Sequence, residues 1–217
     1  MKYRLLAFCL FSTSLIISQG SWNLINIKYN KSPKLSFFAE AQLRSLNTYD
    51  QFHYYEYKAG ANYKITEDFV ATLAAGKYET YKEGGNFVTP KNVSEFRIWP
   101  QLTLTQKLFR LKIEHRYRGE FRFTDAGYKN RIRYRLGLSY PFGKERNGVK
   151  PFQFNINDEL FFTNNEPFFQ KNRLWASMFY RFSKKIYVQL GYIYQTDYKV
   201  NDETGKDFIQ VGLYIEF

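Results

Sequence analysis

Two long segments in the middle of the chain alternate between apolar and polar residues. Over residues 109–122 and 131–140 nearly every second residue is apolar, and most residues between them are arginine, lysine or glutamate. A period of two places the two sets on opposite faces of a β-strand. The segments run for roughly 11 to 13 residues, whereas strands of globular proteins average about 5 to 6 and tilted membrane strands about 9 to 11. Their length favours strands that cross a membrane.

The composition agrees with membrane strands in a hydrophilic chain. The mean hydropathy is −0.51, and Phe, Tyr and Trp make up 20% of the residues. In a membrane barrel only alternate residues meet lipid, so the average hydropathy stays low. A soluble secreted β-sandwich or lipocalin-like barrel remains the structural alternative. We expect no nucleic-acid partner in spite of the net charge of +12, because the start of the chain directs it to secretion.

The first 20 residues predict a secretory signal peptide. A basic start over residues 1–4 is followed by an apolar run over residues 5–17 and by Ser18-Gln19-Gly20. This is the order of a cleaved leader, and the apolar run is too short for a membrane anchor. Cys9, the single cysteine, lies in this leader after Phe8, so neither lipidation nor a disulfide is expected. Residues 21–217 then form one domain, an outer-membrane β-barrel.

The rest of the chain reads as strands joined by turns. We predict a short strand over residues 22–30 and then five hairpins, or ten strands, from Leu35 onward. Short turns fall near residues 32, 67, 107, 146 and 184, and longer polar loops lie between them. Pro100 lacks a donor for the ladder and predicts irregular pairing. The fold class is therefore all-β, a single antiparallel up-and-down transmembrane barrel of 10–12 strands. Since single-chain bacterial barrels have even strand numbers, either ten strands close and residues 22–30 form an extra edge or plug, or there are twelve.

The final strand carries an end pattern of its own. A polar residue, a glycine two positions on, and apolar residues at the third-last and last positions look like the assembly signal of bacterial outer-membrane barrels. The pattern predicts location in the bacterial outer membrane, with outer-membrane lipid and the barrel-assembly machinery as partners. The residues of this signal are Gln210, Gly212, Ile215 and Phe217.

Several strand motifs together resemble a known family. The segments EAQLR (40–44), EHRYR (114–118), RIRYRLGLSY (131–140) and NRLW (172–175), with the terminal Phe217, are similar to an uncharacterised, domain-of-unknown-function family of outer-membrane β-barrels from Gram-negative bacteria. The resemblance covers essentially the whole mature chain. It implies a barrel fold and an outer-membrane location, and it implies no activity.

The polar face of the predicted strands would line the barrel lumen, and bases outnumber acids on it. One interpretation is a closed lumen, which a hydrated Arg–Glu network fills and stiffens. The other is a narrow, porin-like, anion-preferring pore or a binding site for a small anionic ligand. The predicted lumen charge network consists of Glu40, Arg44, Glu95, Arg97, Glu114, Arg116, Arg118, Glu120, Arg131, Arg133 and Arg135.

Catalytic residues are sparse, so we do not predict an enzyme. His115 is expected on the outward face, but Tyr117 occupies the position where outer-membrane lipases carry a serine. His53 lies beside Asp50 in a predicted loop, and Asp125 lies in another. The alternative function is an outer-membrane lipid- or peptide-cleaving enzyme with a site on the rim or the lipid-facing wall. No cofactor or metal motif is present.

Overall fold

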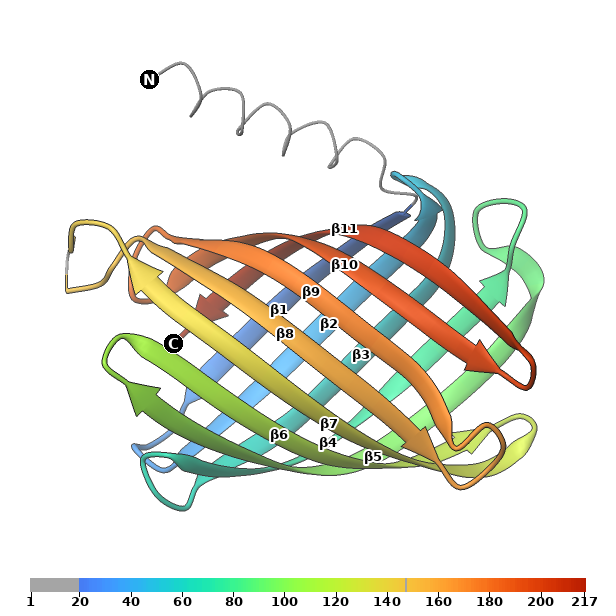
Figure 1. Cartoon of the computed structure of the whole chain (residues 1–217), viewed down its shortest axis with the longest axis horizontal. Coiled ribbons are helices and arrows are strands. Elements are labelled where there is room, and N and C mark those ends of the chain that lie inside the picture. Colours follow the sequence, from blue (N-terminus) through green and yellow to red (C-terminus); the bar gives the residue numbers. More distant parts are fainter. Residues whose placement is uncertain (1–19, 147) are drawn as a thin grey trace.

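The computed structural model describes residues 20–146 and 148–217, which form one closed β-barrel (Figure 1). Apart from Gly20, the predicted signal peptide lies outside these residues. No helix in the described part of the chain is long and apolar enough to cross a membrane. The strands are β1 (Gly20–Asn30), β2 (Leu35–Asn47), β3 (Asp50–Lys64), β4 (Phe69–Lys82), β5 (Val88–Leu108), β6 (Leu111–Thr124), β7 (Gly127–Phe142), β8 (Phe152–Thr163), β9 (Phe169–Arg181), β10 (Ile186–Lys199) and β11 (Asp202–Glu216).

Neighbours in sequence are neighbours in the barrel wall, and each such pair is antiparallel. The ring closes between β1 and β11, which run parallel, from Gly20 opposite Phe208 to Lys28 opposite Glu216. The predicted fold class, an all-β up-and-down barrel of 10–12 strands, is confirmed. The expected even number of strands, ten or twelve, was wrong, because the described residues contain eleven strands.

The segment predicted as an extra edge or plug is a wall strand. Its odd residues Ile25, Ile27 and Tyr29 are 39–55% exposed on the outer surface, whereas Trp22 is buried inside. The ten strands β2–β11 alternate in direction, so β2 and β11 run in opposite directions. A strand that is antiparallel to β2 must therefore run parallel to β11. A parallel closing pair still satisfies the backbone groups of both edges, so the ladder tolerates an odd number of strands.

The last residue of the chain helps to seal this closing pair. The backbone N–H of Phe217 donates to the carbonyl of Lys28 over 2.9 Å, and the carbonyl of Phe217 accepts from the N–H of Asn30 over 2.9 Å. The amide of the Asn30 side chain donates to the same carbonyl over 3.1 Å. The ring of Phe217 takes no part and points outward, 61% exposed.

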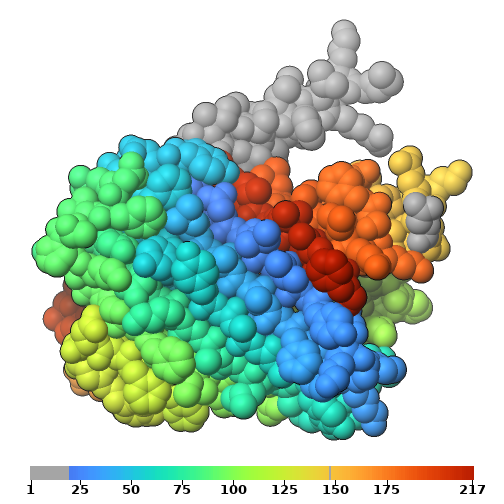
Figure 2. Space-filling model, turned by 180° about the vertical axis from the view of Figure 1, so that it is seen from behind, coloured from blue at the N-terminus to red at the C-terminus, as the bar shows by residue number. Residues whose placement is uncertain are grey.

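The barrel has an apolar outside and a polar inside. Large apolar side chains such as Leu73, Ile132 and Leu190 are 57–64% exposed on the outer wall, and Figure 2 shows the part of this outer surface that β1–β5 contribute. The buried interior holds more polar and charged residues than apolar ones, including Glu120 and Glu159 at 1–2% exposure. This distribution is the reverse of that in a soluble protein.

The connections do not show the predicted asymmetry between short turns and long loops. At the end of the barrel that carries Phe217 they span residues 31–34, 65–68, 109–110, 143–151 and 182–185, and at the opposite end 48–49, 83–87, 125–126, 164–168 and 200–201. The longest, 143–151, lies where only short turns were expected. Polar residues of the predicted long loops instead continue the hairpin ladders, because a paired strand keeps its backbone hydrogen bonds in water as well.

The irregularity predicted at Pro100 is confirmed. Pairing between β5 and β6 runs to Ile98 opposite Phe121 and resumes only at Gln101 opposite Arg118. The skipped residues are Trp99 and Pro100, since proline cannot donate to the ladder. The interruption leaves the alternation intact, so Arg97, Trp99 and Gln101 all line the interior.

Two glycines of the wall give a matched test of its packing. A Cβ on Gly60 would collide with the Cβ of Ala74, whereas a Cβ on Gly119 would meet no atom within 4 Å. We expect Gly60→Ala to lower the free energy of unfolding by about 1–3 kcal/mol, because the wall must shift to admit the methyl group. Gly119→Ala should change it by less than about 0.5 kcal/mol. Urea unfolding of the refolded barrel measures both, and equal effects would contradict this packing.

Candidate functional site in the barrel lumen

The barrel encloses a cavity of about 1040 Å³ that all eleven strands of the described chain line. Among the described residues, sixteen lysines and arginines line it but only six aspartates and glutamates. The cations are concentrated on β6 and β7, which contribute seven of them. The lumen is therefore a polar compartment with a large excess of positive charge.

The structure places all eleven residues of the predicted lumen charge network inside the barrel. Ten line the cavity, and Glu120 is buried, with its side chain 0% exposed against arginines. Five more charged residues of the described chain form ion pairs with members of this network, namely Glu56, Lys58, Lys112, Arg122 and Glu159, and Arg173 pairs in turn with Glu159.

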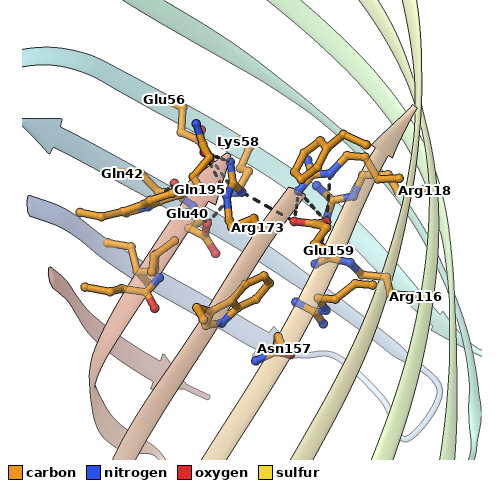
Figure 3. Close-up of a pocket in the computed structure, with 18 of the residues that line it drawn as sticks. Glu40, Gln42, Glu56, Lys58, Arg116, Arg118, Asn157, Glu159, Arg173 and Gln195 are labelled. Atoms are coloured by element: carbon orange, nitrogen blue, oxygen red, sulfur yellow. Dashed lines mark hydrogen bonds and ion pairs between the residues drawn. The ribbon is translucent and has the colours of Figure 1, made fainter. Parts of the chain in front are cut away.

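Glu159 on β8 holds three arginines from three strands. Arg133 on β7 donates from Nη2 to both carboxylate oxygens over 2.8 Å and from Nε over 3.0 Å. Arg116 on β6 donates to the same carboxylate, and Arg173 on β9 lies 3.6 Å from it. In Figure 3, Arg116 and Arg173 approach Glu159 from different sides. One carboxylate cannot neutralise three guanidiniums.

Glu120 on β6 repeats this arrangement. Arg131 donates from Nε over 2.8 Å and Arg133 from Nη1 over 2.5 Å, while Arg118 lies 3.8 Å away. Arg133 thus bridges Glu120 and Glu159. The two carboxylates together face five arginines, so the centre of the lumen carries net positive charge.

Like charges also stand directly opposite each other in the wall. Arg116 is paired with Arg135 and Arg118 with Arg133 between β6 and β7, and Arg97 is paired with Arg122 between β5 and β6. Such cross-strand pairs destabilise a sheet. A local conflict of this kind is expected where the residues serve a function rather than the stability of the fold.

A second cluster occupies the wall of β2 and β3. Lys58 Nζ lies 2.6 Å from Glu40 and 2.7 Å from Glu56, and Arg44 lies 3.3 Å from Glu56. Here acids and bases are balanced, in contrast to β6 and β7. The basic excess is therefore on one side of the lumen.

Aromatic rings fix the planes of several guanidiniums. The guanidinium carbon of Arg44 lies 3.3 Å from the ring centroid of Trp22 and 4.1 Å from that of Tyr54. Arg173 approaches Trp22 to 4.6 Å, and Arg118 approaches Trp99 to 3.9 Å. Stacking occupies the faces of a guanidinium and leaves its edge N–H groups free to bind a planar acceptor.

Several buried donors point to what the lumen could bind. Within residues 20–146 and 148–217, no hydrogen-bond partner is found for Nε of Arg44, Arg97, Arg116 and Arg135, or for Nε1 of Trp99. Trp99 is only 2% exposed, and an unsatisfied buried donor costs free energy. Nδ1 of His53, which also lines the lumen, has no partner among these residues either. The guanidinium and indole atoms are donors, so an acceptor-rich, anionic solute matches them.

The catalytic candidates do not come together. His115 faces outward, where Nδ1 lies 2.9 Å from the hydroxyl of Tyr134, whereas His53 lies in β3 rather than in a loop and lines the cavity. Asp125 accepts a hydrogen bond from the backbone of Ser94 over 3.0 Å. The described residues contain no group of three His, Cys, Asp or Glu that could hold a metal ion.

The residues of the predicted assembly signal lie on both faces of β11. Gln210 points inward and accepts a hydrogen bond of 2.7 Å from Gln189. A Cβ on Gly212 would lie 2.9 Å from the Tyr214 ring. Phe217 points outward, as does Ile215 by the alternation of the strand.

These features define a closed β-barrel with an arginine-rich lumen. The chain belongs to a family described as protein of unknown function (DUF2490), whose model matches residues 19–206. The predicted membership in an uncharacterised barrel family is confirmed. No curated protein matches the chain. A solved structure of the NanC porin, in a rhombohedral crystal form, is similar at a TM-score of 0.49 and 13% identity, over 89% of this chain and 99% of that one.

Glu159 gives the sharpest test of the arginine cluster. We expect Glu159→Gln to lower the free energy of unfolding by about 3–5 kcal/mol, because three buried guanidiniums lose a shared counter-charge. Glu67→Gln is the control: Glu67 is 84% exposed in a 3.4 Å pair with Lys64, and its loss should cost less than about 1 kcal/mol. Urea unfolding checks both. A small effect at Glu159 would mean that water screens the cluster.

Proposed function

We propose that this protein is an outer-membrane barrel whose lumen admits small anionic solutes, as a narrow anion-preferring pore or as an anion-binding site. The observation that carries the proposal is the excess of cations over acids in the lumen, sixteen to six among the described lining residues. The five buried donors that lack an acceptor support it. Rings of basic side chains are the usual means of anion selectivity in pores.

The outer wall supports the membrane location. It presents apolar and aromatic side chains on strands of 11 to 21 residues, long enough for a tilted membrane strand of about 9 to 11 residues. A closed barrel leaves no unpaired edge in lipid. Outer-membrane lipid would then contact the outer wall, and barrel-assembly machinery would recognise the last strand.

The basic wall would act on an anion in two ways. Fixed positive charge in a compartment walled by protein raises the local concentration of anions. Guanidinium edges, held by stacking on Trp22, Tyr54 and Trp99, would replace part of the hydration shell of a carboxylate or phosphate. Arg116 and Arg135 each keep an unpaired Nε and stand directly opposite each other between β6 and β7, so together they are well placed to do so.

A second candidate is a lumen that conducts nothing. Trp99, Glu120, Glu159 and Phe161 are all at most 2% exposed, so the side chains in the middle of the barrel pack closely. In that case the same arginines would bind an anion without passing it, or would only stiffen the wall. Conductance separates these outcomes.

For the pore, the test is single-channel conductance of the refolded mature chain in a planar bilayer under a salt gradient. We expect anion-selective current steps. Replacing both Arg116 and Arg135 with Gln should lower the anion-to-cation permeability ratio several-fold, since two lumen charges are lost. Lys31→Gln with Lys184→Gln removes the same charge from exposed turns outside the cavity and should leave selectivity unchanged. Unchanged selectivity in the arginine variant would refute the pore.

Recognition of the last strand is tested with Phe217. Phe217→Ala keeps the backbone bonds to Lys28 and Asn30 but removes the exposed ring. We expect far less assembled barrel in cells, while the purified variant refolds in detergent as well as the parent chain. Heat-modifiable migration in gels measures both. Equal assembly in cells would contradict a terminal recognition signal.

A further inference from the structure

On β8 an acidic side chain interrupts an otherwise apolar outward row. On β8 the outward row consists of Phe152, Phe154, Ile156, Asp158, Leu160 and Phe162, whereas the alternate residues Asn157 and Glu159 line the lumen. Asp158 therefore faces outward with two apolar residues of its own strand on either side. Apolar residues also stand directly across from it on both neighbouring strands, Leu136 on β7 and Leu174 on β9.

Asp158 is not alone on this surface. Asn172 on β9 donates from Nδ2 to Oδ1 of Asp158 over 2.6 Å, and both side chains are half-buried. The surrounding Leu136, Ile156 and Leu174 are 36–49% exposed. The outer face of β7–β9 is thus an apolar surface with one polar pair at its centre, which we call the Asp158 patch.

Lipid is a poor environment for this pair. A carboxylate has about four acceptor sites, and the amide has a second N–H and a carbonyl oxygen, but a single hydrogen bond joins the two members of the pair. Both side chains are also shorter than lysine or arginine, which can extend a charged head along an apolar surface toward water. An ionisable residue inside a membrane is costly and marks a functional contact.

We propose that the Asp158 patch is an interface with a second copy of this chain in the plane of the membrane. The inference rests on the membrane location proposed above and is independent of the pore. The occupant follows from the chemistry of the patch: the pair contains an acceptor-rich group and a donor, so it is complementary to itself. A two-fold axis along the membrane normal brings two such pairs together, and the surrounding leucine and isoleucine side chains exclude lipid around them.

Residues 10–217 contain no cysteine, so a single introduced cysteine can test the interface by cross-linking. Leu174→Cys places a thiol directly across from Asp158, and Leu73→Cys on β4, itself 61% exposed, is the matched control on another part of the wall. The full barrel is reconstituted into lipid vesicles and oxidised. We expect a covalent dimer from the Leu174 variant and at least about tenfold less from the Leu73 variant.

A second variant tests the role of the carboxylate. Asp158→Leu, in the Leu174→Cys chain, makes the outward row of β8 wholly apolar and suits lipid, so the barrel should fold. We expect the cross-linked fraction to fall about tenfold. Heat-modifiable migration of the same samples reports insertion. An inserted barrel that gives no dimer, a dimer that persists in Asp158→Leu, or cross-links to other proteins alone would overturn the interface. A chain that does not insert would overturn the membrane location and the interface with it.

Discussion

Closure of the backbone ladder is the constraint on which the rest of this structure depends. Every strand edge in the ring has a partner, and the last pair, β1 with β11, meets that requirement in a parallel register. Once the ring is closed, the period of two in each strand leaves only two environments, inside and outside. Arginines and glutamates therefore collect in the lumen because the chain closes, not because they attract one another across an open sheet.

Inside the ring, charge is distributed unevenly. The wall of β2 and β3 pairs its bases with acids, as Lys58 is paired with Glu40 and Glu56, whereas Glu120 and Glu159 each contact three arginines. Stability alone would not produce this surplus, since buried cations without counter-charges are costly. Aromatic stacking lowers part of that cost and orients the guanidiniums. This uneven distribution is the basis of the anion compartment proposed above.

Alternation in the sequence predicted the inward position of Arg116, Arg118 and Arg133, because a strand allows only two choices per residue. It did not predict that β1 belongs to the wall, since that depends on pairing between the two ends of the chain. Contacts between strands far apart in the ring, such as Arg173 with Trp22, have no local signal either. Asp158 did have a local signal, because the same alternation places this acid in an outward row whose other members are apolar.

The three tryptophans of the sequence, Trp22, Trp99 and Trp175, all line the lumen. In many membrane barrels tryptophan lies at the lipid interface, so its fluorescence reports on the bilayer. Here the emission would report on the interior. A solute that enters beside Arg118 or Arg44 would alter the fluorescence of Trp99 or Trp22. A quencher dissolved in lipid would reach none of the three tryptophans. The intrinsic tryptophan fluorescence of the barrel is therefore a probe of what its lumen contains.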